Sequence, residues 1–158
     1  MFVLTGHEHG QYIGIDIDVK GDAGFYSLVR YYEVLIDAHQ FVDTLSCKTP
    51  SGGYHFVFKV SGNQAQYFQR KLWNSQLRLF DCDIDVIYNL GRFMMSSAYK
   101  SKDGQKIYQL IDDHKIAPLP PVLFNEIKSK IEYISELAQQ KDKIKEKLDN
   151  PKVKDDTV

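Results

Sequence analysis

Apolar and polar residues alternate along several short stretches of this chain, and between them apolar residues recur at helical spacing. Residues 2–6 and 12–19 alternate with the period of two that is typical of strands. Residues 25–39 place apolar side chains three and four positions apart, which predicts a helix. The elements predicted after it are strands over 41–49 and 54–60, a short helix over 63–73, and strands over 81–89, 91–97 and 106–112.

Glycine and proline mark the turns between these elements. The stretch GHEHG at 6–10 lies between two predicted strands, so we interpret it as a hairpin turn rather than as a metal site built on His7 and His9. The stretch PSGG at 50–53 predicts the tight turn of a second hairpin. The proline-rich APLPP, residues 117–121, ends the run of predicted strands.

The order of strands and helices predicts an α+β fold, with a mixed or antiparallel sheet and the helices on one face. The length of 158 residues fits one domain, which we place over residues 1–124. Residues 125–158 predict a C-terminal helix that frays into a charged, partly disordered tail. Two interpretations of this segment stay open, a linker to a further domain and a solvated helix.

Charge and cysteine content narrow the classes of function. A formal net charge of −1 argues against a broad basic surface that grips many phosphates, so any binding of nucleic acid should be local or should depend on metal ions or a partner. The two cysteines, Cys47 and Cys82, form neither a CxxC pair nor a disulfide framework. We therefore expect a reducing, intracellular compartment (cytoplasm, nucleus or virus replication site). We see no secretion signal and no membrane span.

Two carboxylates interrupt the second predicted strand. Asp16 and Asp18 share one face, because side chains two apart on a strand point the same way, while isoleucines line the other face. Neighbouring like charges repel, and a divalent cation such as Mg²⁺ or Mn²⁺ between them would remove that conflict. The alternative is an edge strand with two solvated aspartates.

Three further features point to the same chemistry. Asp83 and Asp85 repeat the two-apart pattern on a later strand. The turn at 50–53 can expose backbone N–H groups that bind an anion, and His55 follows it. A single histidine on a strand is often structural, but the combination of acidic strands, glycine turn and histidine indicates a site for metal and phosphate.

At these residues the chain resembles a known family. The stretches GIDIDVKGD, TPSGGYHFVF and DIDVIYNLGRFMMSSAYKSKDGQKIYQLI, followed by DDHKIAPLPPVLF, together resemble the catalytic core of the archaeo-eukaryotic primase superfamily. The resemblance is greatest to the primase-polymerase (prim-pol) type of viruses, plasmids and phages. It covers roughly residues 2–124, and its specificity comes from three motifs in order at family-like spacing.

The resemblance implies an RRM-like sheet (that is, one like the RNA-recognition motif) with the site on its open face. It implies a DNA primase/polymerase that adds nucleotides by a two-metal mechanism in DNA replication. Asp16, Asp18 and Asp85 match the metal-binding acids, with Mg²⁺ or Mn²⁺ as the ions, whereas Asp83 has no counterpart. His55 matches the histidine that contacts the nucleotide phosphates. The expected nucleotide-binding residues are Ser51, Gly52, Gly53, His55, Lys48 and Arg92, with Lys100 and Lys102 as further candidates from their proximity in sequence.

The chain departs from the family in two places. The usual module before the first strand is missing, which suggests a fragment or a minimal form that is weak or silent in isolation. Ser96 and Ser97 stand where the family often has prolines, which affects the expected substrate contacts there.

The expected partners are a DNA template and primer, nucleoside triphosphates, and a replicative helicase domain or subunit. The alternatives are a non-catalytic nucleic-acid-binding or replisome-assembly module with a primase-like fold, and a metal-dependent nuclease.

Overall fold

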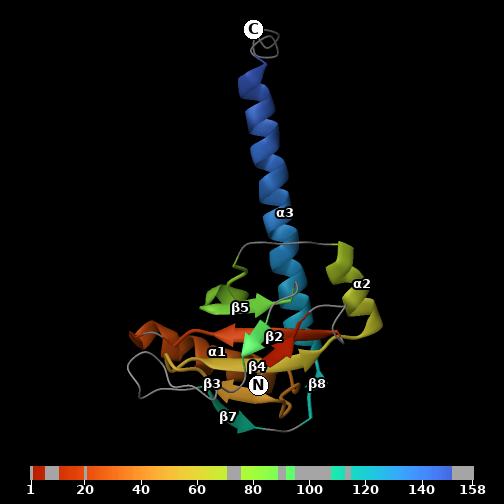
Figure 1. Cartoon of the computed structure of the whole chain (residues 1–158). Helices are drawn as coiled ribbons and strands as arrows, with labels where there is room; N and C mark the ends of the chain where they lie inside the picture. Colours follow the sequence, from red (N-terminus) through yellow and green to blue (C-terminus); the bar gives the residue numbers. More distant parts are fainter. Residues whose placement is uncertain are drawn as a thin grey trace.

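The computed structural model in Figure 1 describes residues 2–5, 11–19, 21–70, 76–88, 92–94, 108–112 and 115–150, and it confirms the α+β class. In chain order the elements are β1 (Phe2–Leu4), β2 (Tyr12–Ile17), α1 (Gly21–Asp37), β3 (Ser46–Lys48), β4 (Tyr54–Lys59), α2 (Gly62–Arg70), the short 3-10 turn η2 (Leu79–Asp81), β5 (Ile84–Ile87), β6 (Arg92–Met94), β7 (Gln109–Asp112), β8 (Ala117–Pro118) and α3 (Pro121–Asp149).

The main sheet has the strand order β5-β2-β4-β3-β7, and all neighbours along this path are antiparallel. The short strand β8 pairs with β4 in parallel, so the sheet is mixed. Its first four strands and the helices between them follow the order β-α-β-β-α-β, which is the connectivity of ferredoxin-like folds. This topology places β2, which contains Asp16 and is followed directly by Asp18, between β5 and β4 in the interior of the sheet.

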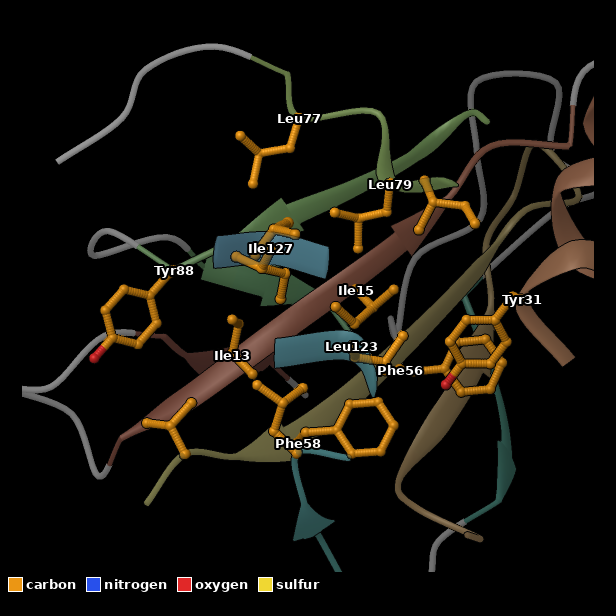
Figure 2. Close-up of a cluster of buried hydrophobic side chains, with 14 of the residues drawn as sticks. Ile13, Ile15, Tyr31, Phe56, Phe58, Leu77, Leu79, Tyr88, Leu123 and Ile127 are labelled. Carbon is orange, nitrogen blue, oxygen red and sulfur yellow. The ribbon is translucent and has the colours of Figure 1, made fainter. Parts of the chain in front are cut away.

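One face of the sheet packs on the helices, as Figure 2 shows. Alternation along β2 and β4 places fully buried isoleucine and phenylalanine side chains on this face, where they meet side chains of α1 and α3. Each of these large apolar side chains contributes roughly 1.5–3 kcal/mol of stabilisation when it is fully buried. The labelled members of this core are Ile13, Ile15, Tyr31, Phe56, Phe58, Leu77, Leu79, Tyr88, Leu123 and Ile127.

The opposite face is partly covered by a second, two-stranded sheet. In it β1 pairs antiparallel with β6, so the prediction that the first two strands form a hairpin is wrong. The turn expected over residues 6–10 lies outside the described residues. Phe93 of β6 lies against Gly14 of β2, where an added Cβ would come within 2.8 Å of the Phe93 ring. Glycine at this position therefore allows the small sheet to lie close to the large one.

The second hairpin is confirmed, because β3 and β4 pair on either side of the turn at 50–53. The predicted strand over 41–49 shortens to three residues, and the predicted strand over 81–89 is preceded by η2. The helix predicted over 25–39 forms as α1, but it does not bury all its apolar residues. Phe25, Val29 and Ile36 are exposed, whereas Tyr31 and Leu35 enter the core.

The helix α3 has a buried half and an exposed half. Leu123, Ile127 and Ile131 pack in the core, and the domain boundary expected after residue 124 falls inside this helix. Beyond Ser135 every described residue is exposed, and the helix extends away from the sheet (Figure 1). None of the helices in the described ranges combines the length and the apolar character needed to cross a membrane.

Candidate functional site

Three of the predicted site residues lie in one row across three neighbouring strands. In the sheet register, Asp16 of β2 stands opposite Asp85 of β5 on one side and opposite His55 of β4 on the other. Residues directly opposite in an antiparallel pair have Cβ atoms about 4.5–5.5 Å apart and share a face. This face is opposite the helix-covered one, because Ile15 and Ile17, the neighbours of Asp16, point into the core.

A second pair of carboxylates lies one step further along the same strands. The amide of Asp18 donates to the carbonyl of Asp83 at 3.0 Å, which continues the β2–β5 pairing beyond its last ladder residue. Asp18 and Asp83 are both exposed. Four carboxylates therefore share this end of the sheet, and like charges directly opposite each other destabilise a sheet.

The Asp85 carboxylate is held in place by backbone donors. Its Oδ1 accepts hydrogen bonds from the amides of Val86 at 2.8 Å and Leu77 at 3.3 Å. The Leu77 side chain is buried in the core, which anchors the segment that supplies the second donor. Hydrogen bonds of this kind hold one oxygen of the carboxylate in a defined position.

His55 is fixed by stacking as well as by its strand. Its ring stacks on the Phe93 ring at a centroid distance of 4.0 Å and an interplanar angle of 21°, and its Nε2 lies 3.3 Å from Asp16 Oδ1. Tyr108 lies beside the same imidazole, at 5.7 Å between centroids. The small sheet that carries Phe93 thus orients the histidine toward the first aspartate.

The glycine turn closes one side of the site. Gly53 approaches the end of β2 so closely that an added Cβ would lie 2.5 Å from the Ile17 carbonyl oxygen. Gly52 has a φ of 92°, a conformation that favours glycine. The Gly52 amide donates to the Thr49 carbonyl, and the Gly53 amide donates to Thr49 Oγ1. Both amides are therefore occupied within the turn, so phosphate contacts from this segment would fall to Ser51 and the Thr49 hydroxyl.

Two recesses meet at the paired aspartates, because Asp16 and Asp18 line both of them. The larger, of about 180 Å³, is completed by the glycine turn, His55 and Tyr108. The smaller, of about 110 Å³, is completed by Asp83 and Asp85 together with Arg78. Besides the two shared aspartates, one recess is thus lined by hydroxyl groups and a histidine, and the other by two further acids and one guanidinium group.

A strained turn carries Arg78 to the acidic recess. Arg78, Phe80 and Asp81 all have positive φ values between 53° and 58°, which are uncommon for residues other than glycine. Two residues of α3 hold this turn: Glu126 accepts a hydrogen bond from the Phe80 amide, and Lys130 pairs with Asp81. The hydrogen bond from Lys130 holds the pKa of the exposed Asp81 carboxyl below its usual value.

The donor set suits a hard divalent cation, since carboxylate oxygens are the ligands that Mg²⁺ and Mn²⁺ prefer. Within the described ranges, however, no group of three or more His, Cys, Asp or Glu side chains stands ready to hold an ion. Asp85 stands opposite Asp16, Asp18 lies two residues further along the chain, and all three line a shared recess.

The structure does not bring all the expected nucleotide-binding residues together. Lys48 stands opposite Tyr54 in the register, so its side chain lies on the helix side of the sheet, away from His55. The prediction for Lys48 is therefore not supported, because proximity in sequence does not fix the face of a strand. Arg92 lies in β6, but its side chain falls outside the description, as do Lys100 and Lys102.

Sequence reasoning missed several residues of the site. Thr49 directly precedes the glycine turn, so the TPSGG motif could have identified it. Tyr108 and Phe93 contact His55 only because the fold brings distant segments together, so the local sequence could not identify them. Arg78 had no sequence signal, because it enters the site through a left-handed turn without glycine or asparagine. No protein-family model matches the chain, and a search of curated proteins gives no match either.

The close approach of Gly53 leads to a testable prediction. Gly53→Ala should push the turn away from Ile17 and lower the free energy of unfolding by about 1–3 kcal/mol, as overpacking does. Gly62→Ala is the matched control, because nothing lies within 4 Å of its added Cβ and the residue is in α2. Urea denaturation of both variants checks this, and equal stabilities would contradict the close contact.

Proposed function

We propose that the protein is a nucleotidyltransferase of the DNA primase/polymerase kind, which adds nucleotides to a chain under the direction of a template. The observation that carries the proposal is the row of Asp85, Asp16 and His55 across adjacent strands, beside Asp18 and the glycine turn. Transfer of a nucleotidyl group requires mainly positioning and neutralisation of charge. The acids that line the two recesses are suited to hold the cations that neutralise charge, and His55 and the hydroxyls beside them are suited to position the phosphates.

Each part of the site has a distinct task in this proposal. Asp16, Asp18 and Asp85 would hold divalent ions, with Asp16 and Asp18 placed to serve both recesses. When bound, such ions activate the primer 3′ hydroxyl and neutralise charge on the nucleotide phosphates. His55 would donate from its imidazole to the triphosphate, aided by the hydroxyls of Thr49 and Ser51. Stacking on Phe93 keeps that imidazole in position.

The same acids weigh against a plain nucleic-acid-binding module. Such modules bind phosphates through lysine and arginine, whereas this end of the sheet presents four carboxylates. A phosphate chain approaches them favourably only when cations lie between. The acids therefore favour metal-dependent phosphoryl chemistry over binding alone.

The direct test is primer extension by the whole chain. A labelled primer on a DNA template, with deoxynucleotides or ribonucleotides and either Mg²⁺ or Mn²⁺, should be lengthened in a template-dependent manner, and chelation by EDTA should stop the reaction. Mn²⁺ binding is measured separately by electron paramagnetic resonance. If the chain binds DNA and Mn²⁺ but lengthens no primer under any of these conditions, this chain does not polymerise nucleotides by itself, and the non-catalytic module is favoured.

His55 gives a prediction that separates binding from folding. His55→Gln should weaken binding of a non-hydrolysable nucleotide analogue about ten- to a hundredfold, because one charge-assisted hydrogen bond contributes roughly 1.5–3 kcal/mol. The free energy of unfolding should fall by only about 1 kcal/mol, as for a typical substitution. Titration calorimetry and urea denaturation measure the two effects. A large loss of stability with unchanged nucleotide affinity would make His55 a structural residue.

A further inference from the structure

The exposed half of α3 carries a narrow apolar seam. Leu137, Ile144 and Leu148 are 37%, 58% and 64% exposed, although they are large and apolar. Together with Lys141 they follow the alternating spacing of four, three and four residues that is typical of the a and d positions of a coiled coil. Upstream the seam joins Ile134, which packs against the core. The register of the seam therefore continues from the half of the helix that the domain already holds.

The charges beside the seam are of one sign. Lys145 and Lys147 flank it, and Lys141 lies within it, whereas Asp142 and Glu146 lie on the far side of the helix. Opposite charges three or four residues apart, such as Asp142 with Lys145 and Lys145 with Asp149, offset like-charge pairs such as Lys141 with Lys145. The feature that bears on a partner is therefore the positive sign of the charges beside the seam.

We propose that this seam binds an acidic amphipathic helix of a partner protein, with apolar residues facing Leu137, Ile144 and Leu148 and with glutamate or aspartate opposite the lysines. Burial of the seam supplies the attraction, and the lysines select the sign of the partner's charges. A second copy of this chain fits poorly. In a parallel pair Lys141 would face Lys141 of the other copy, and the seam is flanked by Ala138, Gln140 and the two lysines, without an acid.

The test uses a designed probe and the full chain. The probe is a labelled three-heptad peptide with isoleucine and leucine at its a and d positions and glutamate at e and g. The control probe has lysine at e and g. Fluorescence anisotropy should show saturable binding of the acidic peptide, at least tenfold tighter than that of the basic peptide, with the difference shrinking at high salt because exposed charges are screened.

Variants of the chain test whether the acidic peptide binds at the seam. Ile144→Ser should weaken binding of the acidic peptide at least tenfold, and Lys145→Glu should do the same by reversing a flanking charge. Lys143→Glu makes the same charge change off the seam and should leave binding unchanged. Circular dichroism checks that the domain stays folded, as expected because these side chains are exposed. Equal binding of the acidic and basic peptides, or by all variants, would overturn the proposal. So would sedimentation showing that the chain dimerises through Ile144.

Discussion

Exchanging Asp85 for asparagine is expected to lower metal-dependent nucleotide incorporation about a thousandfold while the protein stays folded. A metal ion at a phosphoryl-transfer site contributes several kcal/mol to the transition state, and each 1.36 kcal/mol corresponds to a factor of ten in rate. Asparagine keeps the Oδ1 that accepts from Val86 and Leu77. It also removes the repulsion between Asp85 and Asp16, so the free energy of unfolding should stay equal or rise.

Two further variants test whether the loss of activity is specific to the acids of the site. Asp16→Asn should match the loss, because Asp16 lines both recesses. Asp37→Asn, at the exposed end of α1, makes the same charge change away from the site and should retain full activity. Single-turnover primer extension and urea denaturation measure rate and stability. If Asp83→Asn were inactive and Asp85→Asn active, the assignment of the acids to the site would be wrong.

Ending the chain after Phe124 is expected to unfold the domain or bring it close to unfolding. The cut removes Ile127 and Ile131, which are 0% and 2% exposed and together contribute roughly 3–6 kcal/mol by burial. The whole free energy of unfolding of a domain is about 5–15 kcal/mol. The cut also removes the contacts from α3 that hold the turn at Phe80 and Asp81.

The matched truncation ends after Leu137 and keeps all the buried residues of α3. The residues that it removes within the described range, 138–150, are exposed, so its free energy of unfolding should lie within about 0.5 kcal/mol of the full chain. Urea denaturation curves of the three chains give the comparison. Similar stabilities for the two truncated chains would show that the folded domain ends before Ile127.

Local periodicity explains what the sequence could predict. A period of two fixes which residues of a strand share a face, so the common face of Asp16 and Asp18 followed from β2 alone. The hairpin of β3 and β4 followed from a short glycine turn. The helix spacing identified α1, but it could not decide which of two apolar stripes enters the core, and Phe25 and Val29 of the outer stripe stay exposed.

The pairing of strands that are distant in the sequence could not be predicted from local sequence patterns. β1 pairs with β6, about ninety residues later, rather than with β2, which follows it in the chain. Both edges of β2 are occupied, one by β5 and the other by β4. Lys48 fell on the wrong face because the face of β3 depends on its register against β4. Arg78 reached the site through positive φ values that its residue type does not suggest. These features depend on packing of the whole chain.

The long C-terminal helix α3 also extends the molecule well beyond its sheet (Figure 1). Glu126 and Lys130, in its buried half, contact the turn at Phe80 and Asp81. Its exposed part from Glu136 to Leu148 is about 18 Å long, at a rise of 1.5 Å per residue. Any group joined to the tip of α3 would therefore be held at the far end of this exposed part, away from the sheet (Figure 1).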